Sequence, residues 1–234
     1  METNKKYYQI SVSPEPKIIG VSNGVYQVEI HEKSIEKDHK YYEFTKWFDY
    51  KNPNFWENQD KVSTLETPSV KGKMLKKAKL TDIMGYAPEY HGLHDVYSQK
   101  FVDILKSFNS EKFNLFDFDI ENVPEKYYFM FVKTIPTHDI IFDRSLIYTG
   151  HKMTDNLKYH KIDGYQEYRS FKTTTPLARF EKIAIPSNHY GKDLISIQPA
   201  VNLFCSERLV DFLLDCKITG LQVAYNNSIQ LEFV

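Results

Sequence analysis

The segment "PEYHGLHD" has the residue types that could bind a metal ion. His91 and His94 lie three residues apart, with Glu89 and Asp95 on either side. Imidazole and carboxylate groups are common zinc ligands, so a cluster of His91, His94 and Asp95 could serve a small metal-dependent enzyme. No Glu stands between the two histidines, where a zinc protease motif places its general base. The pattern favours a polar loop without metal or cofactor, with the enzyme as the alternative.

The segment "THDIIFDRS" has the residue types of a nucleophilic triad. It contains His138, Asp139, Asp143 and Ser145. An exposed catalytic serine in a G-x-S-x-G elbow is flanked by glycines that permit a sharp turn. Ser145 has no such neighbours, so the pattern favours a strand over 138–143 that ends in turn residues.

Two serines begin similar segments, "SQKFVDILKSF" and "SERLVDFLLDC". Ser98 and Ser206 each precede apolar residues at helical spacing. The matched pairs that follow are Lys100 and Arg208, Phe101 and Leu209, Val102 and Val210, Asp103 and Asp211, Leu105 and Leu213. A serine at this position accepts a hydrogen bond from the first helical turn, a contact worth about 1 kcal/mol. We therefore interpret both serines as helix caps, and we expect Gly220 to end the second helix.

The surrounding pattern predicts an α+β fold with mixed or antiparallel sheets and one amphipathic helix packed in each half. Asn23-Gly24 predicts a hairpin over 17–31. Apolar or alternating residues predict strands over 113–120, 126–135, 177–185 and 194–198, and two more around Asn226-Asn227. The polar stretch 149–176 is expected to form loops and short strands. We expect a β-rich subdomain over 1–92 with an aromatic insertion, and an α+β region over 93–234, in one compact body of two related subdomains.

Composition narrows the class of protein further. The 17 Tyr and 16 Phe among 234 residues predict a core of ring against ring. A formal net charge of −1 argues against nucleic acid as a partner. No apolar run approaches the ~18 residues of a membrane helix, and the first residues do not resemble a signal peptide, so we expect a cytoplasmic protein without a membrane partner. Cys205 and Cys216 would lie about 16 Å apart on one helix, which predicts reduced thiols.

Two aromatic segments contain the candidate partner-binding residues. The first supplies Trp47, Tyr50 and Trp56. The second supplies Tyr159, His160, Tyr165 and Tyr168. Trp and Tyr are favoured anchors of protein interfaces. For the first segment, the alternative is that its rings pack over the first sheet.

The two capped units, the aromatic strand between them and the closing motif resemble a family of bacterial immunity proteins of polymorphic-toxin and contact-dependent competition systems. The closing match is S-E-R-L at 206–209 and T-G-L at 219–221, with Ile218 where the family often has Leu. The resemblance covers roughly residues 93–224. It implies a protein that is not an enzyme, binds a cognate toxin made by the same cell and blocks it by steric occlusion. It transfers no catalytic residue and names no toxin or oligomeric state. A structural or phage-related interaction module is a further alternative.

Overall fold

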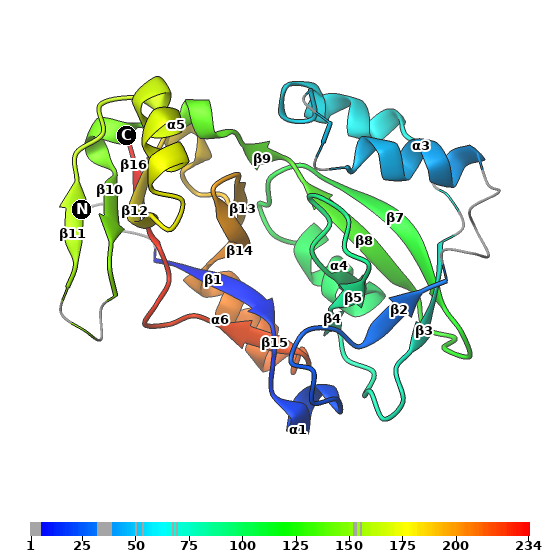
Figure 1. Ribbon diagram of the computed structural model, residues 1–234. Coiled ribbons are helices and arrows are strands. Elements are labelled where there is room, and N and C mark those ends of the chain that lie inside the picture. The colour runs from blue at the N-terminus through cyan, green and yellow to red at the C-terminus, as the bar shows by residue number, and fades with distance from the viewer. Residues whose placement is uncertain are drawn as a thin grey trace.

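The protein has an α+β fold in two halves that lie side by side (Figure 1). The computed structural model describes residues 6–31, 39–49, 51–52, 54–66, 68, 70–151, 154 and 156–234. Within these residues the strands form three sheets, and helices cover them, so the predicted fold class is confirmed.

The seven-stranded sheet of one half has the order β4-β6-β8-β7-β3-β2-β5. Its strands are β2 (Val28–Ile30), β3 (Val70–Met74), β4 (Ile83–Met84), β5 (Tyr86–Ala87), β6 (Val96–Ser98), β7 (Phe113–Ile120) and β8 (Tyr127–Val132). The strand predicted over 126–135 begins with β8, which pairs with β6 on one side and β7 on the other. In β7 the buried Phe116 and Phe118 alternate with the exposed Asp117 and Asp119, because successive side chains of a strand point to opposite faces.

Aromatic rings fill the core of this half. Helix α3 (His39–Trp47) and the 3₁₀ helix η1 (Trp56–Thr64) lie over the sheet (Figure 1). Phe44 of α3 meets Phe116 with ring centroids 5.0 Å apart, and Phe55 meets Phe131 at 5.5 Å. The aromatic segment therefore packs over the sheet, which confirms the packing alternative for most of its rings.

The other half contains two sheets, with orders β15-β1-β14-β13-β9 and β11-β10-β12-β16. The first consists of β1 (Tyr7–Val12), β9 (Thr134–Ile135), β13 (Leu194–Ile197), β14 (Ala200–Ser206) and β15 (Leu221–Val223). The second consists of β10 (Leu146–Thr149), β11 (Lys158–His160), β12 (Arg179–Ile185) and β16 (Gln230–Phe233). β1 pairs with β14 and β15, so the chain's first strand belongs to a sheet made otherwise of later residues, and residue 92 does not separate the sheets.

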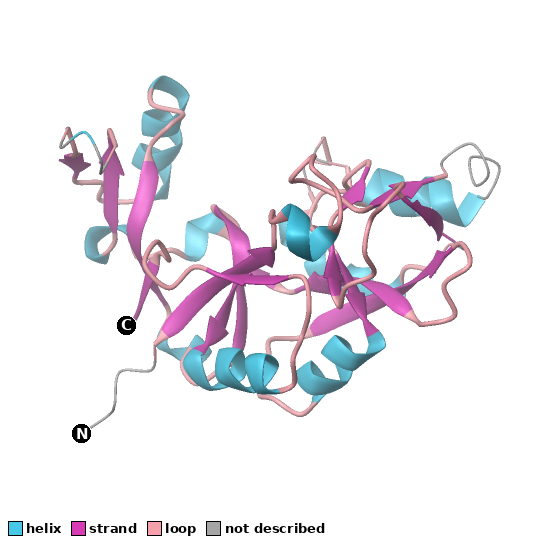
Figure 2. Cartoon of the chain, turned by 90° about the horizontal axis from the view of Figure 1, so that it is seen from below, coloured by secondary structure: helices cyan, strands magenta, loops and turns pink. Residues whose placement is uncertain are grey.

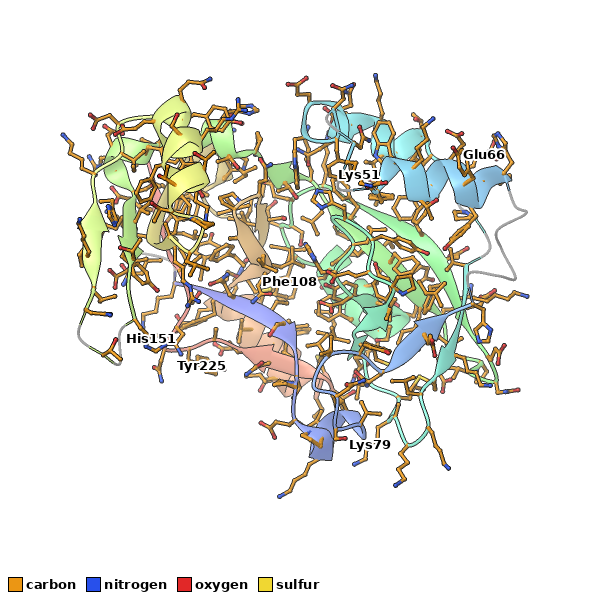
Figure 3. All side chains as sticks on the ribbon, in the orientation of Figure 1. Lys51, Glu66, Lys79, Phe108, His151 and Tyr225 are labelled. Atoms are coloured by element: carbon orange, nitrogen blue, oxygen red, sulfur yellow. The ribbon has the colours of Figure 1, made fainter. Side chains whose placement is uncertain are left out.

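The two serine-capped segments form α4 (Gln99–Lys106) and α6 (Glu207–Asp215). Their buried apolar faces share one core, which includes Phe101 and Leu105 from α4 and Leu209 from α6. Seen from below, the two helices lie side by side along one face of the molecule (Figure 2). Phe108, which follows α4 and is labelled in Figure 3, contacts Phe212 of α6 with ring centroids 5.3 Å apart. The repeated segments are therefore paired packing elements.

Several predicted elements were wrong, each for a local reason. Instead of a hairpin strand, the chain forms a helical turn, α1 (Pro16–Ile19), because proline fits the first helical position and Gly20 at φ +81° closes the turn. Residues predicted as a strand over 138–143 form two 3₁₀ turns, η2 (Thr137–Asp139) and η3 (Phe142–Arg144). A further short turn, η5 (Ser187–His189), follows β12.

The stretch 149–176, predicted as loops and short strands, contains the short strand β11 and also helix α5 (Tyr165–Thr174), which was not predicted. Its core-facing residues are Tyr165, Tyr168 and Phe171, which are spaced by three along an otherwise polar sequence. Periodicity judged by aliphatic residues does not detect such a face, because three rings alone supply the apolar contacts.

Gly220 is not the cap of α6. The helix ends at Asp215 with Cys216 as its C-cap, and Lys217 adopts φ +54°. Gly220 lies beyond this turn at φ +77°, where an added Cβ would lie 2.2 Å from the carbonyl oxygen of Ile83. Glycine is required here because the backbone of the first half passes against it.

Candidate binding groove

Both motif serines are helix N-caps. The Ser98 hydroxyl accepts a hydrogen bond from the Phe101 N–H at 3.2 Å, and the Ser206 hydroxyl accepts one from the Leu209 N–H at 3.3 Å. Each hydroxyl also donates to a carboxylate, Ser98 to Asp82 at 2.8 Å and Ser206 to an aspartate at 2.7 Å. Capping and carboxylate contacts therefore account for the chemistry of both hydroxyls.

Asp82 connects the first unit to the second, an arrangement we call the Asp82 bridge. One carboxylate oxygen accepts a hydrogen bond from the Ser98 hydroxyl, at the N-terminus of α4. The other accepts hydrogen bonds from the N–H and the hydroxyl of Thr219, both at 2.8 Å. Thr219 follows α6, so Asp82 joins the N-terminus of α4 to the turn after α6.

Asp193 makes the reciprocal contact, because it joins the N-terminus of α6 to the turn after α4. We call this arrangement the Asp193 bridge. Its carboxylate binds the Ser206 hydroxyl and accepts the N–H of Asn109, which follows α4, at 3.0 Å. Arg208 adds two hydrogen bonds from its guanidinium, one of them at 2.6 Å. Burial acts to raise the pKa of Asp193, but the bonds from Arg208, Ser206 and Asn109 outweigh it, so the pKa is lowered.

The metal candidates point to different partners. The His91 ring contacts Phe55 and Trp56, with centroids 5.3 and 5.2 Å apart, and burial lowers its pKa. The His94 Nδ1 lies 3.1 Å from a carboxylate oxygen of Glu89. Across the part of the chain that the structure describes, no three His, Cys, Asp or Glu side chains gather as metal ligands.

Asp95 has a different neighbour, the hydroxyl of Tyr97, which donates to its carboxylate at 3.4 Å. Burial raises the pKa of Asp95 to about 7; Glu89 adds to the rise, while His94 and the Tyr97 bond oppose it. A carboxyl group of this kind is partly protonated at neutral pH.

The triad candidates are not arranged for nucleophilic attack. The Ser145 hydroxyl donates to the carbonyl of Ile141 at 2.9 Å and accepts the N–H of Ala184 at 3.0 Å. His138 lies 3.5 Å from the carboxylate of its neighbour Asp139. Ser145 therefore joins the η3 turn to β12.

The partner-binding candidates of the first aromatic segment are half-buried. Trp47 packs against Phe55, and Trp56 contacts Phe55 and His91 edge to face. Tyr50 lies outside the described residues.

The candidates of the second segment lie on β11 and α5, a separate part of the surface (Figure 1). Tyr159 is 51% exposed, and its hydroxyl donates to Glu181. His160 and Tyr165 are half-buried. Tyr168 is 8% exposed and belongs to a core, so its ring is not reachable by a partner in this conformation.

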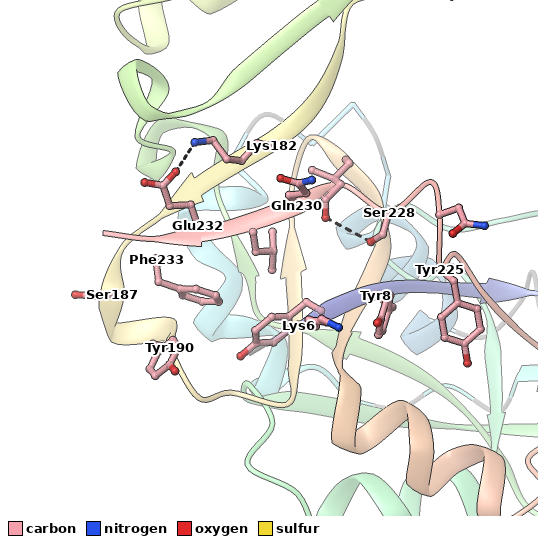
Figure 4. Close-up of a pocket in the computed structure, with 14 residues that line it drawn as sticks. Lys6, Tyr8, Lys182, Ser187, Tyr190, Tyr225, Ser228, Gln230, Glu232 and Phe233 are labelled. Carbon is pink, nitrogen blue, oxygen red and sulfur yellow. Dashed lines mark hydrogen bonds and ion pairs between the residues drawn. The ribbon is translucent and has the colours of Figure 1, made fainter. Parts of the chain in front are cut away.

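A groove between β1 and β16 was not predicted. It has a volume of about 810 Å³, within the usual range of roughly 300–1,000 Å³ for ligand sites. Figure 4 shows side chains from both strands entering the space between them. Tyr8 and Tyr225 form an edge-to-face pair at one end, with centroids 5.1 Å apart. Tyr190 and Phe233 form another, at 5.3 Å.

The groove also has a polar side. Glu232 of β16 binds Lys182 of β12 and Arg144 of η3, and the hydrogen bonds from Lys182 and Arg144 lower the pKa of Glu232. Lys6 lines the groove with a side chain that is 70% exposed and lies 3.8 Å from Glu207. The groove thus combines aromatic rings, which can anchor a partner, with charges that can orient it.

The comparisons with known proteins identify no family. No family model matches the chain, and no curated protein matches it. In the residues that the structure describes, no helix has both the length and the apolar character needed to cross a bilayer.

Sequence reasoning missed the groove because its rings come from four separate segments. Tyr8 lies on β1, Tyr190 follows η5, Tyr225 follows β15, and Phe233 lies on β16. The signal that could have located β1 is the short alternation in "YYQISV", which is typical of a strand. The pairing of β1 with the last third of the chain has no local signal.

Proposed function

We propose that this chain is an immunity protein, which binds a toxin made by the same cell and neutralises it by steric occlusion. The observation that carries the proposal is the use of the motif residues. Ser98 and Ser206 cap helices and bind Asp82 and Asp193, so the residues behind the resemblance maintain a scaffold. When the members of a family share a scaffold and differ at the binding surface, their common residues are expected to have structural roles of this kind.

The mechanism requires a surface that a partner can cover. A standard interface buries about 800 Å² on each partner and is anchored by a few rings and arginines. The groove offers Tyr8, Tyr225 and Phe233, and the exposed Tyr159 lies on β11, at the opposite edge of the sheet that contains β16. These residues lie in the same half of the molecule, and we propose that half as the toxin-binding side. The proposal assigns no catalytic residue.

The test is co-expression with the product of the adjacent gene. The neighbouring protein alone is expected to stop growth, and co-expression of this chain is expected to restore it and to give a complex that co-purifies. Tyr8→Ala together with Tyr225→Ala is expected to weaken rescue. Tyr42→Ala, at an exposed tyrosine of α3 in the other half, is the matched surface control. If the neighbouring protein is toxic and this chain neither binds it nor restores growth, the proposal is wrong.

A further inference from the structure

The outer edge of β16 carries backbone groups that can pair with another strand. β16 is the last strand in the order β11-β10-β12-β16, and among the described residues its strand partner is β12 alone. The other edge faces the groove towards β1 (Figure 4). Such an edge is a ready template for an added strand.

The alternation of hydrogen bonds identifies the groups that face the groove. The Val234 N–H donates to the Ile185 carbonyl, and the Val234 carbonyl accepts the Ser187 N–H, so both groups of Val234 point to the β12 side. In a strand, alternate residues direct both backbone groups to the same neighbour. Glu232 therefore also points to β12, while the N–H and C=O of Leu231 and Phe233 point to the groove.

The side chains beside this edge indicate what an added strand would contain. Leu231 and Phe233 are only partly buried against the core, and Tyr190 contacts Phe233. They offer an apolar surface to alternate side chains of an extended segment. Lys6 lines the same groove with a side chain that is 70% exposed. Its ammonium lies 3.8 Å from Glu207, beyond hydrogen-bond distance, so its N–H donors can serve an acidic side chain of that segment.

We propose that the groove binds an extended segment of the toxin, which adds to the sheet beside β16. The segment is about four residues long, to match the length of β16, and therefore spans roughly 13 Å. Its alternate apolar side chains lie towards Leu231 and Phe233, and it carries an acidic residue near Lys6. This inference rests on the proposed function and specifies the partner surface that it requires.

The first experiment compares Leu231→Pro with Leu231→Ala in binding to the purified product of the adjacent gene. Both variants lose the leucine side chain, but only proline also lacks the N–H that faces the groove. Proline is tolerated at an edge when its missing N–H does not belong to the existing ladder. Leu231→Pro is expected to raise Kd about tenfold or more relative to Leu231→Ala, measured by calorimetry.

Hydrogen exchange provides a readout that does not depend on the folding of a proline variant. In the wild-type complex the amides of Leu231 and Phe233 are expected to exchange at least tenfold more slowly than in the free protein. Lys6→Glu is expected to weaken binding by about tenfold, whereas Lys17→Glu, on α1 and outside the groove, is the control with unchanged Kd.

The outcomes separate the two proposals. A complex that forms with no added protection at Leu231 and Phe233, and equal Kd values for the two Leu231 variants, overturns strand addition and leaves the immunity function standing. Unchanged binding by Lys6→Glu overturns the acidic contact. If the adjacent toxic protein forms no complex at all, the proposed function is wrong and strand addition to that toxin is wrong with it.

Discussion

At the level of single residues, the carboxylates of Asp193 and Asp95 have distinct environments. Asp193 is fully buried, yet its pKa is lowered because Arg208, Ser206 and a backbone N–H all donate to it. Asp95 has one long hydrogen bond, from Tyr97, and burial raises its pKa to about 7. The number of donors, more than burial alone, decides which carboxylate stays ionised.

Asp95 predicts a pH dependence of stability. Its folded pKa of about 7 lies above the unfolded value of about 3.9, so its contribution is fully present below pH ~4 and is lost as the pH rises through 7. Asp95→Asn removes this titration. Urea unfolding should therefore show the variant gaining about 1–3 kcal/mol relative to wild type between pH 4.5 and pH 8.

The exposed Asp143→Asn is the control for the Asp95 experiment. It should follow the wild-type profile over the same pH range. A constant free-energy difference between Asp95→Asn and wild type, whatever the pH, would contradict the prediction.

At the level of elements, the turn after α6 is fixed by its close approach to the other half. Gly220 combines φ +77° with an added Cβ only 2.2 Å from a backbone oxygen. Gly24 has φ +67° but open space, and Gly164 has neither constraint. Comparison of these three glycines therefore distinguishes the effect of a left-handed backbone conformation from the effect of a steric contact.

Alanine at the three positions should give a graded series in free energy of unfolding. Gly164→Ala is expected to change it by less than about 0.5 kcal/mol, and Gly24→Ala to lower it by about 1–2 kcal/mol through its left-handed φ. Gly220→Ala should lower it by more than about 3 kcal/mol, because backbone must also move. Equal effects at Gly24 and Gly220 in chemical denaturation would refute the steric argument.

The elements that the sequence predicts well are those with strong local periodicity. α4 and α6 follow from Ser98 and Ser206 and the apolar residues behind them, and β7 follows from its alternation. α1 and α5 were missed because neither shows that periodicity in aliphatic residues. α1 is a single turn that begins with proline, and the buried face of α5 consists of aromatic rings. The groove and the aspartate bridges depend on pairing between residues more than 80 positions apart, which no local pattern specifies.

At the level of the whole molecule, the two halves depend on each other. β1 pairs with β14 and β15, and Asp82 binds both Ser98 and Thr219. Residues before position 93 therefore complete the sheet and the caps of the later region.

A fragment of residues 93–234 should not fold independently. It would expose the edges of β14 and β15 and would leave Ser98 and Thr219 without the Asp82 carboxylate. Circular dichroism is expected to show no cooperative thermal transition for the fragment, in contrast to the full chain. A sharp transition together with dispersed amide resonances would instead establish the later region as a domain.

The Asp82 and Asp193 bridges have one more consequence. In each half a carboxylate accepts a hydrogen bond from a turn of the other half. This reciprocal arrangement resembles the self-complementary contacts of a two-fold dimer. In a dimer such contacts weaken on dilution, as subunits separate. Here both parties belong to one polypeptide, so the association is intramolecular and keeps its strength however few molecules the solution contains.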